Sequence, residues 1–267
     1  MPNLFIFILF VSFIACQPGK LPEKEVLDTI QIKEEPVVPY EVKYDSPFLM
    51  GHFTPKGHPD FVEIDIKYAD RAGQYMHREA YKAFKQMWEA AREENINLII
   101  RSATRNFDYQ KGIWERKWNG QTTLSDGTNA SKDISNDVER SLKILEYSSM
   151  PGTSRHHWGT DIDFNAFDNA YFESGEGKMI FDWLEINAST FGFARPYTAK
   201  GEDRPHGYNE EKWHWSYLPL STKMTQDAEH QLKDEMIKGF KGDQTPPQIG
   251  VVEKYILGIH KSCKQWH

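Results

Sequence analysis

Two short stretches of the sequence carry imidazole and carboxylate groups at close spacing. The first is SRHHWGTDID at residues 154–163, and the second is EKWH at residues 211–214. Together they offer three histidines, two aspartates and a glutamate that stands three residues before a histidine. Zinc in hydrolases is usually held by three protein ligands of these types, and a water molecule takes the fourth position. The two stretches therefore contain the inventory of a catalytic zinc site.

Within this inventory, His156, Asp163 and His214 can be the zinc ligands, and Glu211 can be the general base. The spacing leaves one choice open. Asp161 and Asp163 share a face if they lie on a strand, so spacing alone does not tell which of them binds metal. A ligating histidine commonly donates its second N–H to a carboxylate, and Asp161 could fill that supporting role.

Both stretches are predicted to lie on or beside strands. Alternating apolar residues predict short strands over residues 62–66, 160–164 and 212–218, and a buried strand at 97–100 that leads into the polar residues 101–105. Apolar residues at helical spacing predict helices over residues 74–94, 107–119, 137–147, 180–191, 222–240 and 251–264. The loop at residues 120–136 is long enough to cover a site, but we expect an ordinary surface insertion.

The N-terminal segment has the features of an export signal. The apolar run at residues 4–15 is shorter than the about 20 residues that span a bilayer, and it suits a signal peptide. FIAC at residues 13–16 resembles a bacterial lipobox, which implies cleavage before Cys16 and a lipid anchor on its thiol. We therefore expect a lipoprotein signal peptide at 1–16 and a flexible tether at 17–45, which would hold the protein to a membrane of the bacterial cell envelope, on its periplasmic or extracellular face.

Charge and cysteine content exclude other classes of site. The net charge of -7 and the absence of a Lys/Arg cluster argue against a nucleic-acid partner, because phosphate binding needs a basic face. The sequence has two cysteines, Cys16 and Cys263, which are too few for a cysteine-based zinc site.

Three motifs carry a family resemblance. The pattern Ser-x-His-x-x-Gly-x-x-x-Asp that begins at Ser154 and the pattern Glu-x-x-His that begins at Glu211 resemble the D-alanyl-D-alanine metallo-carboxypeptidases of the VanY type. These are zinc peptidases related to the lysostaphin-like group. The segment that begins at Ser102 is similar to the family's Ser-Gly-Tyr-Arg-Ser-x-x-x-Gln, with Ala103 and Thr104 in place of Gly-Tyr. The three motifs follow in the family's order within about residues 62–220.

The resemblance implies a role for each motif residue. It selects His156, Asp163 and His214 as ligands of one zinc ion, in preference to their neighbours His157 and Asp161. It makes Glu211 the general base. Arg105 resembles the cation that meets the substrate's carbonyl oxygen or terminal carboxylate, a role that suits its planar, always charged guanidinium. Two further polar residues are implied to hold the C-terminal end of the substrate: Gln110 and Ser154.

The implied fold is α+β, a small antiparallel sheet that carries the zinc site with helices packed around it. The strands and helices predicted from apolar spacing are consistent with this fold class. Residues 46–221 would form the catalytic domain and residues 222–267 a helical C-terminal extension.

The implied activity is zinc-dependent removal of the C-terminal D-alanine from peptidoglycan stem peptides. Three alternatives stay open on the same site: an L,D-carboxypeptidase, a peptidoglycan endopeptidase, and a cell-wall binding module without activity. A serine D,D-peptidase is excluded because Ser-x-x-Lys paired with Lys-Thr-Gly is missing.

Overall fold

A four-stranded antiparallel sheet carries the metal-ligand motifs in the computed structural model, which describes residues 40–266. Its strand order is β3-β4-β6-β5, and its strands are β3 (Ile100–Ser102), β4 (Asp161–Phe164), β6 (His214–Tyr217) and β5 (Phe193–Ala194). A separate two-stranded sheet pairs β1 (Phe61–Glu63) with β2 (Tyr75–His77). The expected α+β class is confirmed. The predicted signal peptide, the lipid anchor and most of the tether lie outside the described residues.

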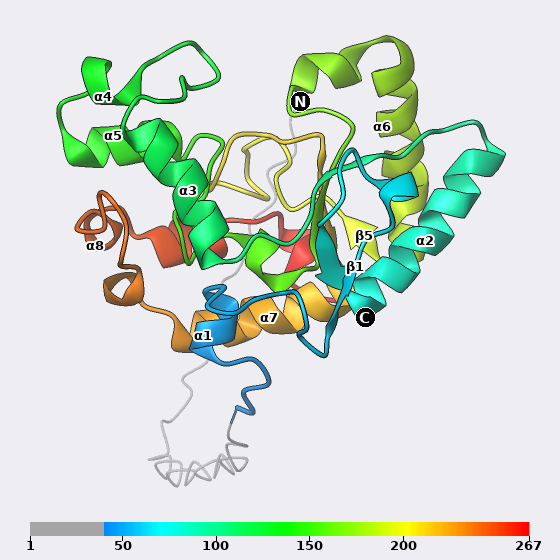
Figure 1. The fold of residues 1–267 in the computed structure, drawn as a ribbon, viewed down its shortest axis with the longest axis horizontal. Coiled ribbons are helices and arrows are strands. Elements are labelled where there is room, and N and C mark those ends of the chain that lie inside the picture. Colours follow the sequence, from blue (N-terminus) through cyan, green and yellow to red (C-terminus); the bar gives the residue numbers. More distant parts are fainter. Residues whose placement is uncertain (1–39, 267) are drawn as a thin grey trace, which may run out of the picture. The chain divides into compact units, whose positions relative to one another are not determined.

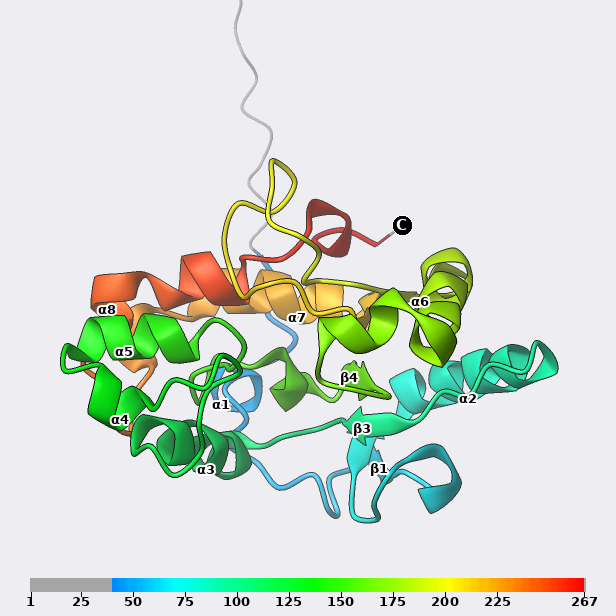
Figure 2. The same cartoon turned by 90° about the horizontal axis from the view of Figure 1, so that it is seen from above.

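The helices form two groups with separate apolar cores (Figures 1 and 2). Helices α2 (Arg78–Glu93) and α6 (Gly175–Asn187) lie together and pack with Ile162 and Phe164 of β4. The second core is built around α3 (Phe107–Trp118), α5 (Asp137–Ile144) and α7 (Leu218–Gln231). Three short helices complete the set: α1 (Ser46–Leu49), α4 (Ala130–Asp133) and α8 (Pro246–Ile249).

Local sequence explains why helices α2 and α3 form. Helix α2 buries a stripe of apolar side chains at helical spacing, from Ala80 to Ala91. Helix α3 starts at an Asn106 cap, whose side chain accepts a hydrogen bond from the Tyr109 N–H at 3.0 Å. Acidic Asp108 in its first turn and basic Lys117 in its last turn suit the helix dipole. This cap fixes the point where the segment after β3 turns into α3.

The C-terminal part differs from the predicted helices. Helix α7 starts at Leu218, earlier than expected, because Pro219 fits the first turn of a helix, where its missing N–H is not needed. The single helix predicted over 251–264 is wrong: a π-helical turn at Val252–Ile256 and a 3-10 turn at Lys261–Cys263 take its place. Between these turns Gly258 lies against Gly207, where a side chain would not fit.

Residues after position 221 share the second core with earlier parts of the chain. Met224, Ala228 and Ile256 belong to the same apolar cluster as Trp114 and Trp158. The predicted division into a catalytic domain at 46–221 and an extension at 222–267 stays a prediction. Across residues 40–266, no helix combines the length and the apolar character that a bilayer crossing requires.

We expect Gly159→Ala to destabilise the fold strongly. Gly159 has φ +71°, and a Cβ there would collide with the Phe61 ring and the His77 backbone nitrogen. Gly73 is a matched control, because it has φ +77° but nothing within 4 Å of an added Cβ. Gly73→Ala should cost about 1 kcal/mol from backbone strain, and Gly159→Ala about 1–3 kcal/mol more from overpacking. Urea unfolding measures both, and equal losses in the two variants would contradict the role of the collision.

Candidate metal centre

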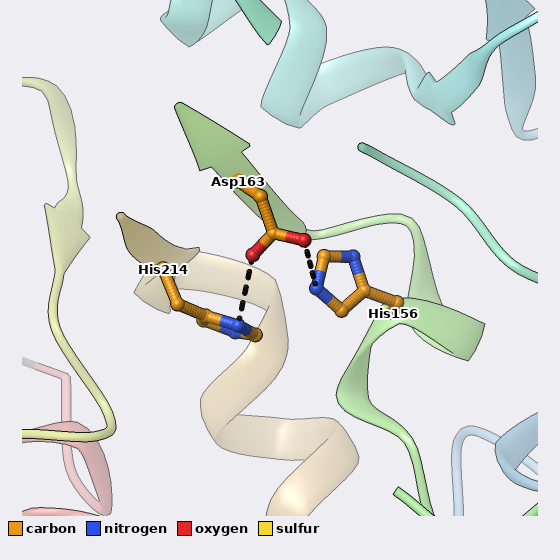
Figure 3. A group of neighbouring side chains, drawn as sticks. All are labelled: His156, Asp163 and His214. Carbon is orange, nitrogen blue, oxygen red and sulfur yellow. Dashed lines mark ion pairs between the residues drawn. The ribbon is translucent and has the colours of Figure 1, made fainter. Parts of the chain in front are cut away.

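Three side chains from three elements meet beside the central strands (Figure 3). His156 comes from the 3-10 turn η2 (Arg155–Trp158), Asp163 from β4 and His214 from β6. The antiparallel register pairs Asp163 directly with His214. The Asp163 carboxylate lies between the imidazoles, with Oδ2 3.2 Å from His156 Nε2 and Oδ1 3.2 Å from His214 Nδ1. One ligand atom from each residue falls within 4.8 Å of the others.

The donor set and its hydrogen bonding suit a zinc ion. All three residues are buried, with 1–3% of their surface exposed. Within residues 40–266, His156 Nε2 and Asp163 Oδ1 have no hydrogen-bond partner. Buried polar atoms in folded proteins are nearly always paired, so two unpaired atoms in one cluster of possible ligands support a metal ion there. Two imidazole nitrogens and a carboxylate oxygen are typical zinc donors.

The hydrogen bonds distinguish His156 from its neighbour His157. His156 Nδ1 lies 2.8 Å from the Ala103 carbonyl and therefore carries the proton, which leaves the Nε2 lone pair facing Asp163. In His157, Nδ1 donates to the Arg105 carbonyl at 2.6 Å and Nε2 accepts from the Gly152 N–H at 3.0 Å. Both nitrogens of His157 are thus engaged with backbone groups.

A similar division separates Asp161 from Asp163. Asp161 is fully buried, and its Oδ2 accepts from Arg155 Nε at 3.0 Å and lies 2.8 Å from His214 Nε2. Its Oδ1 accepts from the hydroxyls of Ser216 and Thr160. The Asp161 carboxylate is therefore saturated, and it holds His214 so that Nδ1 faces Asp163.

Carboxylates dominate the electrostatics of the centre. Glu211 Oε2 lies 3.3 Å from His214 Nδ1, close to Asp163. Burial opposes a charge on His214, but the neighbouring carboxylates of Asp161, Asp163 and Glu211 outweigh it and hold the pKa of this imidazole well above its ordinary value. Burial raises the pKa of Glu211, and the hydrogen bond with His214 offsets part of that effect. A ring surrounded by three carboxylates attracts a cation, either a proton or a metal ion.

Two cavities reach the cluster. The larger, of about 650 Å³, is lined by Asp163, Glu211 and Arg105 together with Tyr147 and Trp213. The smaller, of about 20 Å³, is lined by His156 and His214 together with Arg105, Ser154 and Glu211. Residues 122–125 line the larger cavity, so the expectation that the loop at 120–136 is an ordinary surface insertion was wrong.

The predicted substrate-binding residues occupy different positions. Arg105 lines both cavities, and its guanidinium lies 3.9 Å from Asp163 Oδ2. Ser154 lines the small cavity, and its Oγ has no hydrogen-bond partner within residues 40–266. Gln110 is fully buried and donates from Nε2 to the Ser149 carbonyl at 2.8 Å, so it supports the cavity wall through Ser149. Direct contact of Gln110 with substrate stays a prediction.

Sequence reasoning missed Arg155 and Lys117. Arg155 lies within the first motif, but a basic residue beside two histidines gave no sign that it would be buried against Asp161. Lys117 follows Glu115 and Arg116 in a charged run that is typical of an exposed helix face, yet it lines the larger cavity.

The neutral state of His157 predicts a loss of stability in acid. Burial holds the pKa of His157 at about 3, against an ordinary value of 6.5. Below pH 6.5, His157 binds a proton in the unfolded chain but stays neutral in the folded protein. The free energy of unfolding therefore falls as the pH is lowered to about 3. The free energy of unfolding should drop by about 2 kcal/mol more between pH 7 and 5 in the parent protein than in His157→Gln. Identical drops in urea titrations of the two proteins would refute this assignment.

Comparisons with known proteins identify a family for this chain. A family model described as D-alanyl-D-alanine carboxypeptidase (VanY) matches residues 73–220. YodJ of Bacillus subtilis, which carries the name of a carboxypeptidase, is 28% identical over 218 residues, which cover 78% of this chain and 69% of that protein. A D-alanyl-D-alanine carboxypeptidase of Enterococcus faecalis is 26% identical over 136 residues, which cover 51% of this chain and 46% of that protein.

A similar solved structure is that of VanYB in complex with D-alanyl-D-alanine. It is 20% identical, has a TM-score of 0.47 and covers 66% of this chain and 87% of its own. The family match spans more than half of the chain and includes the motifs that begin at Ser102, Ser154 and Glu211. The chain therefore belongs to the VanY family of D-alanyl-D-alanine carboxypeptidases.

Proposed function

We propose that this protein is a zinc-dependent carboxypeptidase that removes the C-terminal D-alanine from peptidoglycan stem peptides. One observation carries the proposal: His156, Asp163 and His214 converge with two unpaired buried ligand atoms, next to Glu211 at the wall of a cavity. Membership of the VanY family supports the class of substrate.

Glu211 is placed to move protons during hydrolysis. Bound zinc would supply a water molecule with a pKa of about 7 and would polarise the scissile carbonyl. The Glu211 carboxylate lies 3.3 Å from His214 Nδ1 and lines both cavities, so it can take a proton from a water molecule beside the ligands. The same carboxylate can then return the proton to the leaving amine.

The small cavity suits the end of the peptide. Its volume of about 20 Å³ has room for a group the size of a water molecule or a methyl. The unpaired Ser154 Oγ and the Arg105 guanidinium offer donors for a terminal carboxylate or for the developing oxyanion. The side-chain methyl of a C-terminal D-alanine is therefore of a size that this end of the site accepts.

We also propose the cellular setting that the sequence predicts. A peptidoglycan substrate requires a protein of the cell envelope, which agrees with a lipid anchor on Cys16 and a tether at 17–45 ahead of the catalytic domain.

The substrate test uses muropeptides with pentapeptide stems that end in D-Ala-D-Ala and with tetrapeptide stems. The zinc-loaded protein should release one alanine from the pentapeptide, and the chelator-treated protein should release none, as read by mass spectrometry. If the protein trims only the tetrapeptide, it is an L,D-carboxypeptidase. If it cleaves within cross-links, it is an endopeptidase. A zinc-loaded protein that cleaves none of them would contradict the proposed activity and favour a binding module.

Two variants separate the general base from the ligands. Glu211→Gln should lower kcat by a factor of about 10²–10⁴, because a proton acceptor is lost, while zinc stays bound. His214→Ala should lose both zinc and activity, because a ligand is removed. His206→Ala is a matched control at an exposed histidine outside the cluster. Elemental analysis of the purified proteins gives the zinc content, and a Glu211→Gln protein that keeps full activity would remove Glu211 from the mechanism.

A further inference from the structure

Lys117 is a second cation in the larger cavity, in addition to Arg105. It lies in the last turn of α3, and it lines the same 650 Å³ cavity as Arg105, Asp163 and Glu211. Its ammonium group donates a hydrogen bond to Ser148 Oγ. Ser148 is buried and lines both cavities, so this hydrogen bond holds the Lys117 head group at a fixed place in the cavity wall.

The charge of Lys117 has no counterion in the described part of the chain. Within residues 40–266, no carboxylate lies within ion-pair distance of Lys117, whereas nearby Lys143 pairs with both Asp126 and Glu146. Burial, and after it the charge of Arg105, lowers the pKa of Lys117. The charge of Glu211 offsets part of this lowering. A half-buried ammonium without an anion at ion-pair distance is unfavourable, and a carboxylate brought by a ligand would stabilise its charged form.

The positions of the two cavities indicate which carboxylate of the substrate would reach Lys117. The small cavity, whose size suits the methyl group of the terminal residue, is lined by Arg105 and Ser154 and not by Lys117. Lys117 lines the larger cavity, where the acyl segment of the peptide would lie if that methyl group enters the small one. The anion that reaches Lys117 therefore belongs to a residue ahead of the scissile bond.

We propose that Lys117 and Ser148 form a carboxylate-binding subsite for the acyl segment of the substrate. The preferred peptide then carries a side-chain carboxylate on the residue that precedes the D-Ala-D-Ala pair. This inference rests on the proposed carboxypeptidase function and adds to it a second charged group of the substrate.

The test compares two peptides that end in D-Ala-D-Ala and differ at the preceding residue, which has a side-chain carboxylate in one and the matching carboxamide in the other. Dissociation constants are measured by calorimetry on the full chain with Glu211→Gln, so that binding is read without turnover. The carboxylate peptide should bind about tenfold more tightly, as expected for one charge-assisted hydrogen bond. Adding Lys117→Met should make the two affinities equal, and Lys117→Arg should keep the preference.

Lys111→Met is the matched control, because Lys111 lies on the same helix but does not line the cavity. It should leave the tenfold preference unchanged. Equal binding of the two peptides to the protein with native Lys117 would overturn the subsite. An equal loss of both affinities in Lys117→Met would also overturn it, and so would a lack of measurable binding of either peptide. A thermal unfolding curve for Lys117→Met separates a lost contact from a lost fold. Hydrolysis of the carboxamide peptide by the parent protein tests the proposed function separately.

Discussion

The buried ion pair between Arg155 and Asp161 is the interaction on which the metal centre depends. Arg155 is 1% exposed, and its guanidinium donates to Asp161, to Thr225 Oγ1 at 2.8 Å and to Ser216 Oγ at 2.8 Å. These contacts join the turn η2 to β4, β6 and α7. Charged hydrogen bonds are strong where water is excluded, and removal of one partner would leave an uncompensated buried charge. The network therefore holds together the elements that carry the three candidate ligands.

The hydrogen bonds of that network determine which polar residues remain available for a metal ion. Because Asp161 is occupied by Arg155 and His214, its carboxylate cannot also serve a metal ion, and Asp163 on the same face of β4 remains available. His157 is likewise engaged by backbone groups, which leaves His156. The candidate ligands are thus the residues whose neighbours do not already saturate them, and the groups that hydrogen-bond to them would orient them, as is usual around protein metal sites.

Alternation and helical spacing predicted most helices and strands, because these patterns report burial directly. The resemblance of the motifs to the VanY family implied the α+β class and selected the residues that meet at the centre. Spacing alone could not separate Asp161 from Asp163 or His156 from His157. The deciding partners, such as the carbonyls of Ala103 and Arg105, belong to a segment about 50 residues earlier in the chain. The apolar spacing over 251–264 suggested one helix, but the chain there forms a π-helical turn and a 3-10 turn, and Gly258 between them lies against Gly207.

The residues that line the larger cavity come from other segments of the chain than the residues of the candidate metal centre. This separation is relevant to substrate specificity. Sheet strands and the turn η2 supply His156, Asp163 and His214, whereas α3 and the loop residues 122–125 supply one side of the larger cavity. A substitution on α3 can change the charge of this cavity wall without replacing any of the residues that meet at the centre, because those residues lie on η2, β4 and β6. Lys117 occupies such a position. The hydrolytic machinery and the choice of peptide can therefore vary independently within one fold.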